Sequence, residues 1–256
     1  MNKKLALLIC LLAVFGLRIQ AQMDHFAVGF YIGGNVHNMG IGQEFYYDDD
    51  NPIPIKDESL NVVDYTYLKI NDASVSASFG PNIGGFFEFR LNDYFGVQFD
   101  LMFNRTGYYI SGNVDQANIT DTTNLKYKAT VKAANLNIGA TAKLHLFDDH
   151  MSVDLGIVPN YCFKLSKDIE RGIQKSSISY KNEEYNAFGC GVLFGISGYI
   201  GEVFYIGLHY NLGFTNVLKT KTPYLDEASQ QVAYKYENAP SKSSSLQLTV
   251  GMRLKN

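Results

Sequence analysis

The residues that could do chemistry include five histidines: His25, His37, His145, His150 and His209. Catalysis needs a base beside a nucleophile, or a spaced set of metal ligands. No histidine pair has metal-ligand spacing, and the sequence contains neither a Gly-x-Ser-x-Gly motif nor a phosphate-binding loop. We therefore predict no catalytic residues, no metal and no cofactor. One enzymatic alternative stays open, in which His37 and a loop carboxylate form a surface hydrolase or acyltransferase site.

Acidic residues gather in the segment 36–75, as Asp48-Asp49-Asp50 and Asp57-Glu58. Clustered carboxylates can bind Ca²⁺, but this spacing is not that of an EF-hand loop. We expect a solvated acidic loop. Two cysteines of the exported chain, Cys162 and Cys190, are too few for a disulfide scaffold and are expected to be free thiols.

The composition limits the classes of protein to which the chain can belong. Its 256 residues are 46% apolar and 18% charged, with 23 Gly, 18 Tyr, 17 Phe and no Trp. This charged share is lower than in ordinary soluble domains, and the apolar content excludes disorder. A formal net charge of −3 excludes a generally basic surface, so no nucleic-acid partner is expected.

The N-terminus has the pattern of a secretory signal peptide. Lys3 and Lys4 precede an apolar run from Leu5 to Leu17, and Ala21 offers a small residue for cleavage. The run has 13 residues and is too short to span a bilayer as a helix. We expect a signal peptide at 1–21 and one domain at 22–256.

Strict alternation of apolar and other residues predicts eight β-strands. Phe95, Val97, Phe99, Leu101 and Phe103, for example, alternate with Gly96, Gln98, Asp100 and Met102. The strands are expected at 26–35, 76–90, 94–108, 127–145, 151–163, 186–200, 203–217 and 243–255. Tight turns fall near 91–94, 146–150 and 200–203, and long polar loops at 36–75, 109–126, 164–185 and 218–242.

Short turns on one rim and long loops on the other are typical of an outer-membrane barrel. A soluble sandwich or lipocalin-like barrel is the alternative, but the second face of the strands is Gly, Asn, Ser, Thr and Gln rather than Lys and Glu. We predict an all-β, eight-stranded antiparallel up-and-down transmembrane β-barrel with short periplasmic turns and long extracellular loops. Aromatic girdles are expected from Tyr94, Tyr108, Tyr109, Tyr161, Tyr199 and Phe204.

An eight-stranded barrel has an interior just wide enough for side chains to fill. By parity, six charges point inward: Glu88, Arg90, Asp100, Lys143, Asp154 and Arg253. Because a lone charge in a confined lumen is costly, we expect an ion-paired plug. The alternative is a narrow solute or ion pore lined by the same groups.

With a plugged lumen, the working surface is expected at the extracellular loops. Exposed aromatic residues on a loop often mark a contact surface. The candidates lie in the segment 36–75: Phe45, Tyr46, Tyr47, Tyr65 and Tyr67. Packing of these rings over the barrel mouth is the alternative.

Four sequence stretches resemble the PorT-like outer-membrane β-barrel family, the "porin family", of Bacteroidetes. They are 84–89 (GGFFEF), 97–107 (VQFDLMFNRTG), 156–161 (GIVPNY) and 210–217 (YNLGFTNV). The resemblance implies an eight-stranded barrel in a Gram-negative outer membrane, in contact with its lipid. It also implies a link to protein secretion through the type IX system, and it carries over no catalytic residue. Either a protein partner at the extracellular loops or the secretion machinery is therefore the expected partner.

Overall fold

The computed structural model describes residues 26–41, 47–56, 62–115, 124–147, 150–181, 183–201, 203–226, 229, 231–238 and 241–255. The predicted signal peptide lies outside these residues. No helix among them is long and apolar enough to cross a bilayer. The strands are β1 (Phe26–Ile41), β2 (Tyr47–Lys56), β3 (Val62–Arg90), β4 (Phe95–Asp115), β5 (Asn124–Leu146), β6 (Met151–Arg171), β7 (Gln174–Ser179), β8 (Phe188–Ile200), β9 (Phe204–Gly213), β10 (Lys219–Asp226), β11 (Gln231–Asn238) and β12 (Ser241–Lys255).

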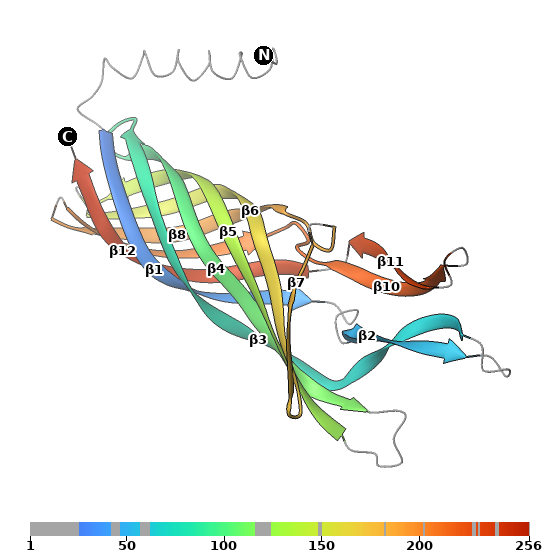
Figure 1. Ribbon diagram of the computed structural model, residues 1–256. Coiled ribbons are helices and arrows are strands. Elements are labelled where there is room, and N and C mark those ends of the chain that lie inside the picture. The colour runs from blue at the N-terminus through green and yellow to red at the C-terminus, as the bar shows by residue number, and fades with distance from the viewer. Residues whose placement is uncertain are drawn as a thin grey trace, which may run out of the picture.

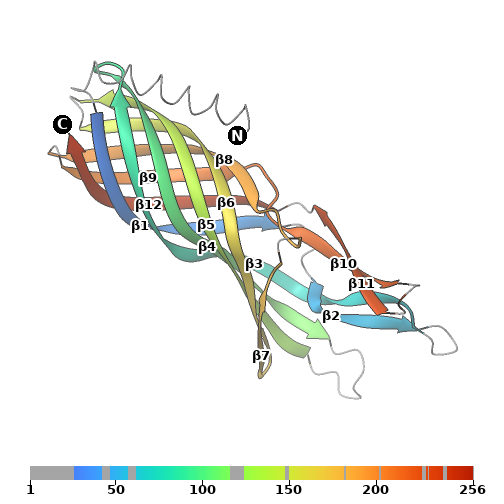
Figure 2. The ribbon, with the colours of Figure 1, turned by 45° about the horizontal axis from the view of Figure 1, so that its top comes forward.

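Eight of these strands form a closed antiparallel ring (Figure 1). Its order is β1-β12-β9-β8-β6-β5-β4-β3, and pairing of β1 with β3 closes it. The predicted eight-stranded up-and-down barrel is confirmed. The remaining strands extend one end of the barrel: β2 pairs with β3, β7 with β6, and β10 with β11 (Figure 2).

The two rims of the barrel differ in their connections. At the short-turn end, β3 and β4 are joined by residues 91–94, where Asn92 Oδ1 accepts hydrogen bonds from the backbone N–H groups of Tyr94 and Phe95, both at 2.9 Å. This Asx turn reverses the chain within four residues. At the opposite rim, here called the long-strand end, β3 to β6 continue well beyond the ring (Figure 1).

The segments predicted as long loops are largely strand, so that part of the prediction was wrong. β1 runs to Ile41, β3 begins at Val62, β4 runs to Asp115 and β6 to Arg171. Conversely, β9 ends at Gly213, short of the predicted 217. The extensions escaped prediction because their polarity is reversed, with apolar residues facing inward and polar residues facing outward.

Strand β5 shows this reversal along one chain. Near the short-turn end, Ile138 points outward and is 56% exposed, while Lys143 points inward and is buried. Towards the long-strand end, Lys132 is outward and exposed, and Val131 is inward and buried. An apolar outer band therefore surrounds the barrel proper, as a bilayer requires, and beyond it the sheet has the polarity of a water-facing protein.

The predicted aromatic girdles are correct only in part. Tyr94, Tyr109, Tyr161 and Phe204 are exposed on the outside, but Tyr108 and Tyr199 are 2% and 3% exposed and point inward. Tyr108 shares the inward parity of Met102 and Asn104 on β4, and Tyr199 that of Ser197 on β8. In a strand, position along the chain does not decide the face; parity does.

Candidate functional site: the lumen

The six charges predicted to face the lumen all lie within the barrel, in its short-turn half. Glu88 and Arg90 come from β3, Asp100 from β4, Lys143 from β5, Asp154 from β6 and Arg253 from β12. The most enclosed are Glu88, Lys143, Asp154 and Arg253, each no more than 2% exposed. Four charged groups can be buried together only where opposite charges and hydrogen bonds offset the cost of removing them from water.

Lys143 is the central cation of the lumen. Its Nζ lies 3.9 Å from Glu88 Oε2 and 3.8 Å from Asp154 Oδ1. It donates a hydrogen bond of 2.8 Å to Gln98 Oε1, and Gln98 Nε2 in turn donates to Asp100 Oδ1 at 2.7 Å. One ammonium group therefore connects three carboxylates from three strands, two of them by direct charge contact.

Glu88 is surrounded by cationic and proton-donating groups. Arg253 Nη1 is 4.0 Å and Arg90 Nε 3.9 Å from Glu88 Oε1, and Tyr199 donates its hydroxyl proton to Oε2 at 3.3 Å. His145 Nδ1 accepts a hydrogen bond from Arg90 at 3.3 Å. Because a guanidinium only donates, the proton of a neutral His145 ring sits on Nε2, which faces Glu88 Oε1 at 3.2 Å.

Asp154 is held by a second set of donors. Ser152 Oγ donates to Oδ1 at 2.7 Å, Ser197 Oγ donates to Oδ2, and His209 Nε2 lies 2.9 Å from Oδ2. His209 fits because Gly195 on the neighbouring strand has no side chain, since a Cβ there would stand 2.2 Å from the imidazole Cδ2. Both carboxylates are thus multiply coordinated, and Lys143 joins the two sets.

An aromatic cluster packs against this network, and sequence reasoning missed it. Its members are Tyr31, Phe86, Met102, Tyr199 and Tyr205. The Arg253 guanidinium lies 3.8 Å from the Tyr199 ring centroid, and Lys143 Nζ lies 5.4 Å from it. The sequence analysis expected small polar residues and six charged side chains inside, and parity also places the large side chains of Phe86 and Met102 there. An inward glycine on the neighbouring strand leaves space for the ring: Gly29 of β1 pairs with Phe86 of β3, and a Cβ on Gly29 would stand 2.3 Å from the Phe86 ring.

The space left above this packing is small. One cavity of about 30 Å³ lies between Asp100, Tyr205 and His209, and another of about 70 Å³ lies towards the long-strand end, beside His37 and Asn104. A single water needs roughly 10–15 Å³ of such volume. The two cavities share Asn137, Val158 and Asn211 in their lining, and each holds only a few waters.

His37 is the residue on which the enzymatic alternative depends. It is buried in the wall of the cavity of about 70 Å³. It is 5% exposed, and its Nδ1 lies 2.9 Å from the carbonyl oxygen of Gly107. A carbonyl only accepts, so Nδ1 carries the proton and donates it. Asn35 Nδ2 similarly donates to Arg105 O at 3.2 Å. Both side chains come from β1 and hydrogen-bond to the backbone of β4, so they stabilise the barrel wall.

The other chemical candidates lie apart from this network. Cys162 is 1% exposed, Cys190 is half-buried, and both are free thiols. Among the described residues no group of three His, Cys, Asp or Glu side chains could hold a metal ion. Phe45 and Tyr46 lie outside the described residues. The backbone of Tyr47 pairs with Lys69, that of Tyr65 with Pro54 and that of Tyr67 with Pro52, which places these three positions in the β2–β3 hairpin.

Three solved structures of bacterial proteins resemble this chain. They are Ail, the attachment invasion locus protein of Yersinia pestis, the outer membrane protein OprG from Pseudomonas aeruginosa, and the outer membrane protease OmpT from Escherichia coli. Sequence identities are 11%, 10% and 9%, and TM-scores are 0.41, 0.40 and 0.43. The matches cover 91%, 91% and 92% of this chain and 100%, 99% and 98% of theirs.

No curated protein matches the sequence. A family model does match, over residues 20–219, and it describes an outer membrane protein beta-barrel domain. The match covers well over half of the chain and includes seven of the eight ring strands. The closed ring, its apolar outer band and this match agree, and the chain belongs to the outer membrane protein beta-barrel domain family.

Proposed function

We propose that this protein is a closed outer-membrane barrel that anchors a surface for interaction with other molecules, and that it carries out no chemical step. The observation that carries the proposal is Lys143, whose side chain is 0% exposed between Glu88 and Asp154. A cation fixed in this way between two carboxylates blocks the lumen at its charged layer. The short-turn end then faces the periplasm and the long-strand end the outside, the usual orientation of such barrels.

The structure of the long-strand end suits a rigid surface for contact with other molecules. Its extensions enclose an apolar core of their own, which includes Ile110, Val131, Leu165, Ile169 and Leu218. Strands with a packed core hold their outward side chains in fixed positions, unlike a flexible loop. The segment 36–75, which contains the β2–β3 hairpin, is the part we propose as the contact surface. Its candidate contact residues are Phe45, Tyr46, Tyr47, Tyr65 and Tyr67.

A protein partner at this end, including a component of the secretion machinery, is the interaction we propose. The resemblance of 210–217 and the other three stretches to PorT-like proteins of Bacteroidetes supports it. Ail, the attachment invasion locus protein of Yersinia pestis, has a similar fold. OmpT is a protease with a similar fold. In this chain, however, the imidazole of His37 is hydrogen-bonded to the carbonyl oxygen of Gly107, which supports a structural role for this histidine.

Single-channel recording tests the closed lumen. The mature protein, refolded into a planar bilayer, is expected to be electrically silent. Glu88→Ala with Lys143→Ala, which removes matched charges and empties the central layer, is expected to give openings. Steady, charge-selective openings of the unmodified protein, altered by Asp100→Asn or Arg253→Gln, would show a narrow pore and contradict the proposal.

Replacement of residues 43–68 by a short Gly-Ser linker tests the interaction surface. The cut stops before Ile70, because that side chain is 2% exposed in the core of the long-strand end. We expect normal membrane insertion, measured by the heat-dependent gel shift of folded barrels, and loss of a cross-linked protein partner in intact cells. The matched control replaces Lys181 and Lys242, two exposed residues outside the hairpin, by Gln and should keep the partner. An unchanged cross-linking pattern after the replacement would contradict the proposal.

A further inference from the structure

The barrel wall carries a recess of about 350 Å³ on its outer face, where the ladder between β3 and β4 is interrupted. Pairing stops at Ala77 with Tyr108 and resumes at Asn82 with Asn104. Four residues of β3, ending in Pro81, therefore face three of β4. Asn35 and His37 close this interruption from the inside by binding the carbonyls of Arg105 and Gly107, so the space left open is on the outside.

Three cations from three adjacent strands line the recess: Arg105 of β4, Lys132 of β5 and Lys164 of β6. Arg105 pairs with Ala134, and Ala134 pairs with Lys164, so these residues form one row across the sheet. Neighbouring strands lie about 4.8 Å apart, which puts the outer two backbones about 10 Å apart with Lys132 between them. All three side chains are exposed, and among the described residues no carboxylate lines the recess.

One of the three charges is offset by a neighbouring acid. Asp168, on β6, accepts a hydrogen bond of 2.6 Å from Lys132 and another of 2.6 Å from Ser177. These hydrogen bonds hold the pKa of Asp168 below its ordinary value, so the carboxylate stays charged. The recess therefore keeps a net positive charge from Arg105 and Lys164, in a chain whose formal net charge is −3.

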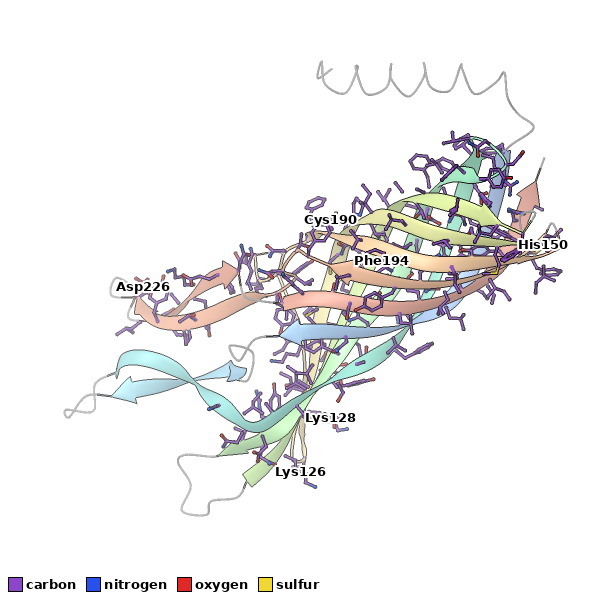
Figure 3. The ribbon with its side chains drawn as sticks, turned by 180° about the vertical axis from the view of Figure 1, so that it is seen from behind. Lys126, Lys128, His150, Cys190, Phe194 and Asp226 are labelled. Carbon is purple, nitrogen blue, oxygen red and sulfur yellow. The ribbon has the colours of Figure 1, made fainter. Side chains whose placement is uncertain are left out.

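The recess also lies at the edge of the apolar outer band. The rings of Phe103 and Phe163 pack together on the outer face with centroids 5.5 Å apart. Phe103 lies two residues before Arg105 in sequence, and Phe163 lies one residue before Lys164. Phe79 and Pro81 add apolar lining. On the far side the outer face of β5 becomes polar, with Lys128 and Lys126 exposed (Figure 3). Acyl chains would lie against the phenylalanines while a phosphate reached the cations.

We propose that this recess binds the phosphate groups of a phosphorylated glycolipid anchored in the outer leaflet. The inference uses the orientation given under Proposed function, with the long-strand end outside, and is independent of whether the lumen conducts. Guanidinium and ammonium groups form the strong, charge-assisted hydrogen bonds that phosphates accept. Arg105 supplies the two-pronged donor, and Lys164 and Lys132 supply point charges.

Binding of purified lipid A to the protein in detergent micelles tests the proposal. Arg105→Gln, Lys132→Gln and Lys164→Gln together are expected to weaken binding at least tenfold, which corresponds to about 1.4 kcal/mol. The matched control, Lys126→Gln, Lys181→Gln and Lys242→Gln, removes the same charge from exposed residues outside the recess and should bind like the unmodified protein. Equal affinities of the two triple variants would overturn the site.

Two further arms use only the unmodified protein and do not depend on the folding of any variant. Enzymatically dephosphorylated lipid A is expected to bind at least tenfold more weakly than the intact lipid, and equal binding would overturn the proposal. Inorganic phosphate at millimolar concentration is expected not to displace the lipid. Displacement would show a site for soluble phosphate and would also overturn it.

Discussion

Lys143 shows at the scale of one residue why distance alone does not measure an ion pair. It stands 3.9 and 3.8 Å from its two carboxylates but is fully buried, whereas Lys132 lies 2.6 Å from Asp168 and is 61% exposed. We expect Lys143→Ala to destabilise the barrel by about 3–5 kcal/mol, because Glu88 and Asp154 remain buried without it. Lys132→Ala should cost about 0–1 kcal/mol. Urea titration followed by the gel shift of the folded barrel measures both, and equal losses would contradict this account.

Gly29 is a second residue whose role is set by a close approach. A Cβ at Gly29 would meet the Phe86 ring at 2.3 Å and Met252 O at 2.5 Å. We expect Gly29→Ala to cost about 1–3 kcal/mol through overpacking, with part of the loss recovered by Phe86→Leu. Gly40→Ala on the same strand is the control, because its nearest neighbour would be 3.8 Å away. The same urea titration applies, and a harmless Gly29→Ala would mean that the aromatic cluster is loosely packed.

At the scale of the elements, the β3–β4 interruption depends on two side chains from β1. We expect Asn35→Ala and His37→Ala each to cost about 1–3 kcal/mol, since each leaves a carbonyl of β4 without its donor. His150→Ala, an exposed histidine at the short-turn end, should stay within about 0.5 kcal/mol (Figure 3). If His37→Ala left stability unchanged but abolished a hydrolytic activity, the enzymatic reading of His37 would replace ours.

The alternation of residues was enough to predict the ring strands and the inward parity of Glu88, Lys143 and Asp154. It could not predict which of these residues touch, since Tyr199 and Glu88 are 111 positions apart in sequence and their contact depends on the stagger of the whole barrel. The alternation of residues also could not predict the positions of β-bulges. Between Cys162 and Lys164 one extra residue on β6 reverses the parity, which is why Leu165, at an odd position, is 1% exposed.

The whole molecule is two layers with opposite polarity that share the same strands. In the membrane layer apolar residues face out and an ion-paired network fills the inside, while in the outer layer lysines face out and a conventional apolar core fills the inside. The strands run without interruption from the membrane layer into the outer layer. Only the surroundings of the outer face change, from lipid to water, at one height along the strands. Strand β5 marks that height between Ala134 and Lys132.

This height can be measured with one substitution placed at two positions on the outer face of β5. Ile138, which is 56% exposed, lies in the middle of the apolar band, and Thr130 lies beyond the cations. We expect Ile138→Arg to destabilise the folded protein in liposomes, lowering its free energy of unfolding by about 2–4 kcal/mol. Thr130→Arg should lower it by only about 0–1 kcal/mol, because the penalty for a lipid-facing arginine falls from the midplane of the bilayer to its interface. Comparable penalties at both positions would mean that the bilayer covers the long-strand end, and that the cationic recess lies within lipid rather than at its surface.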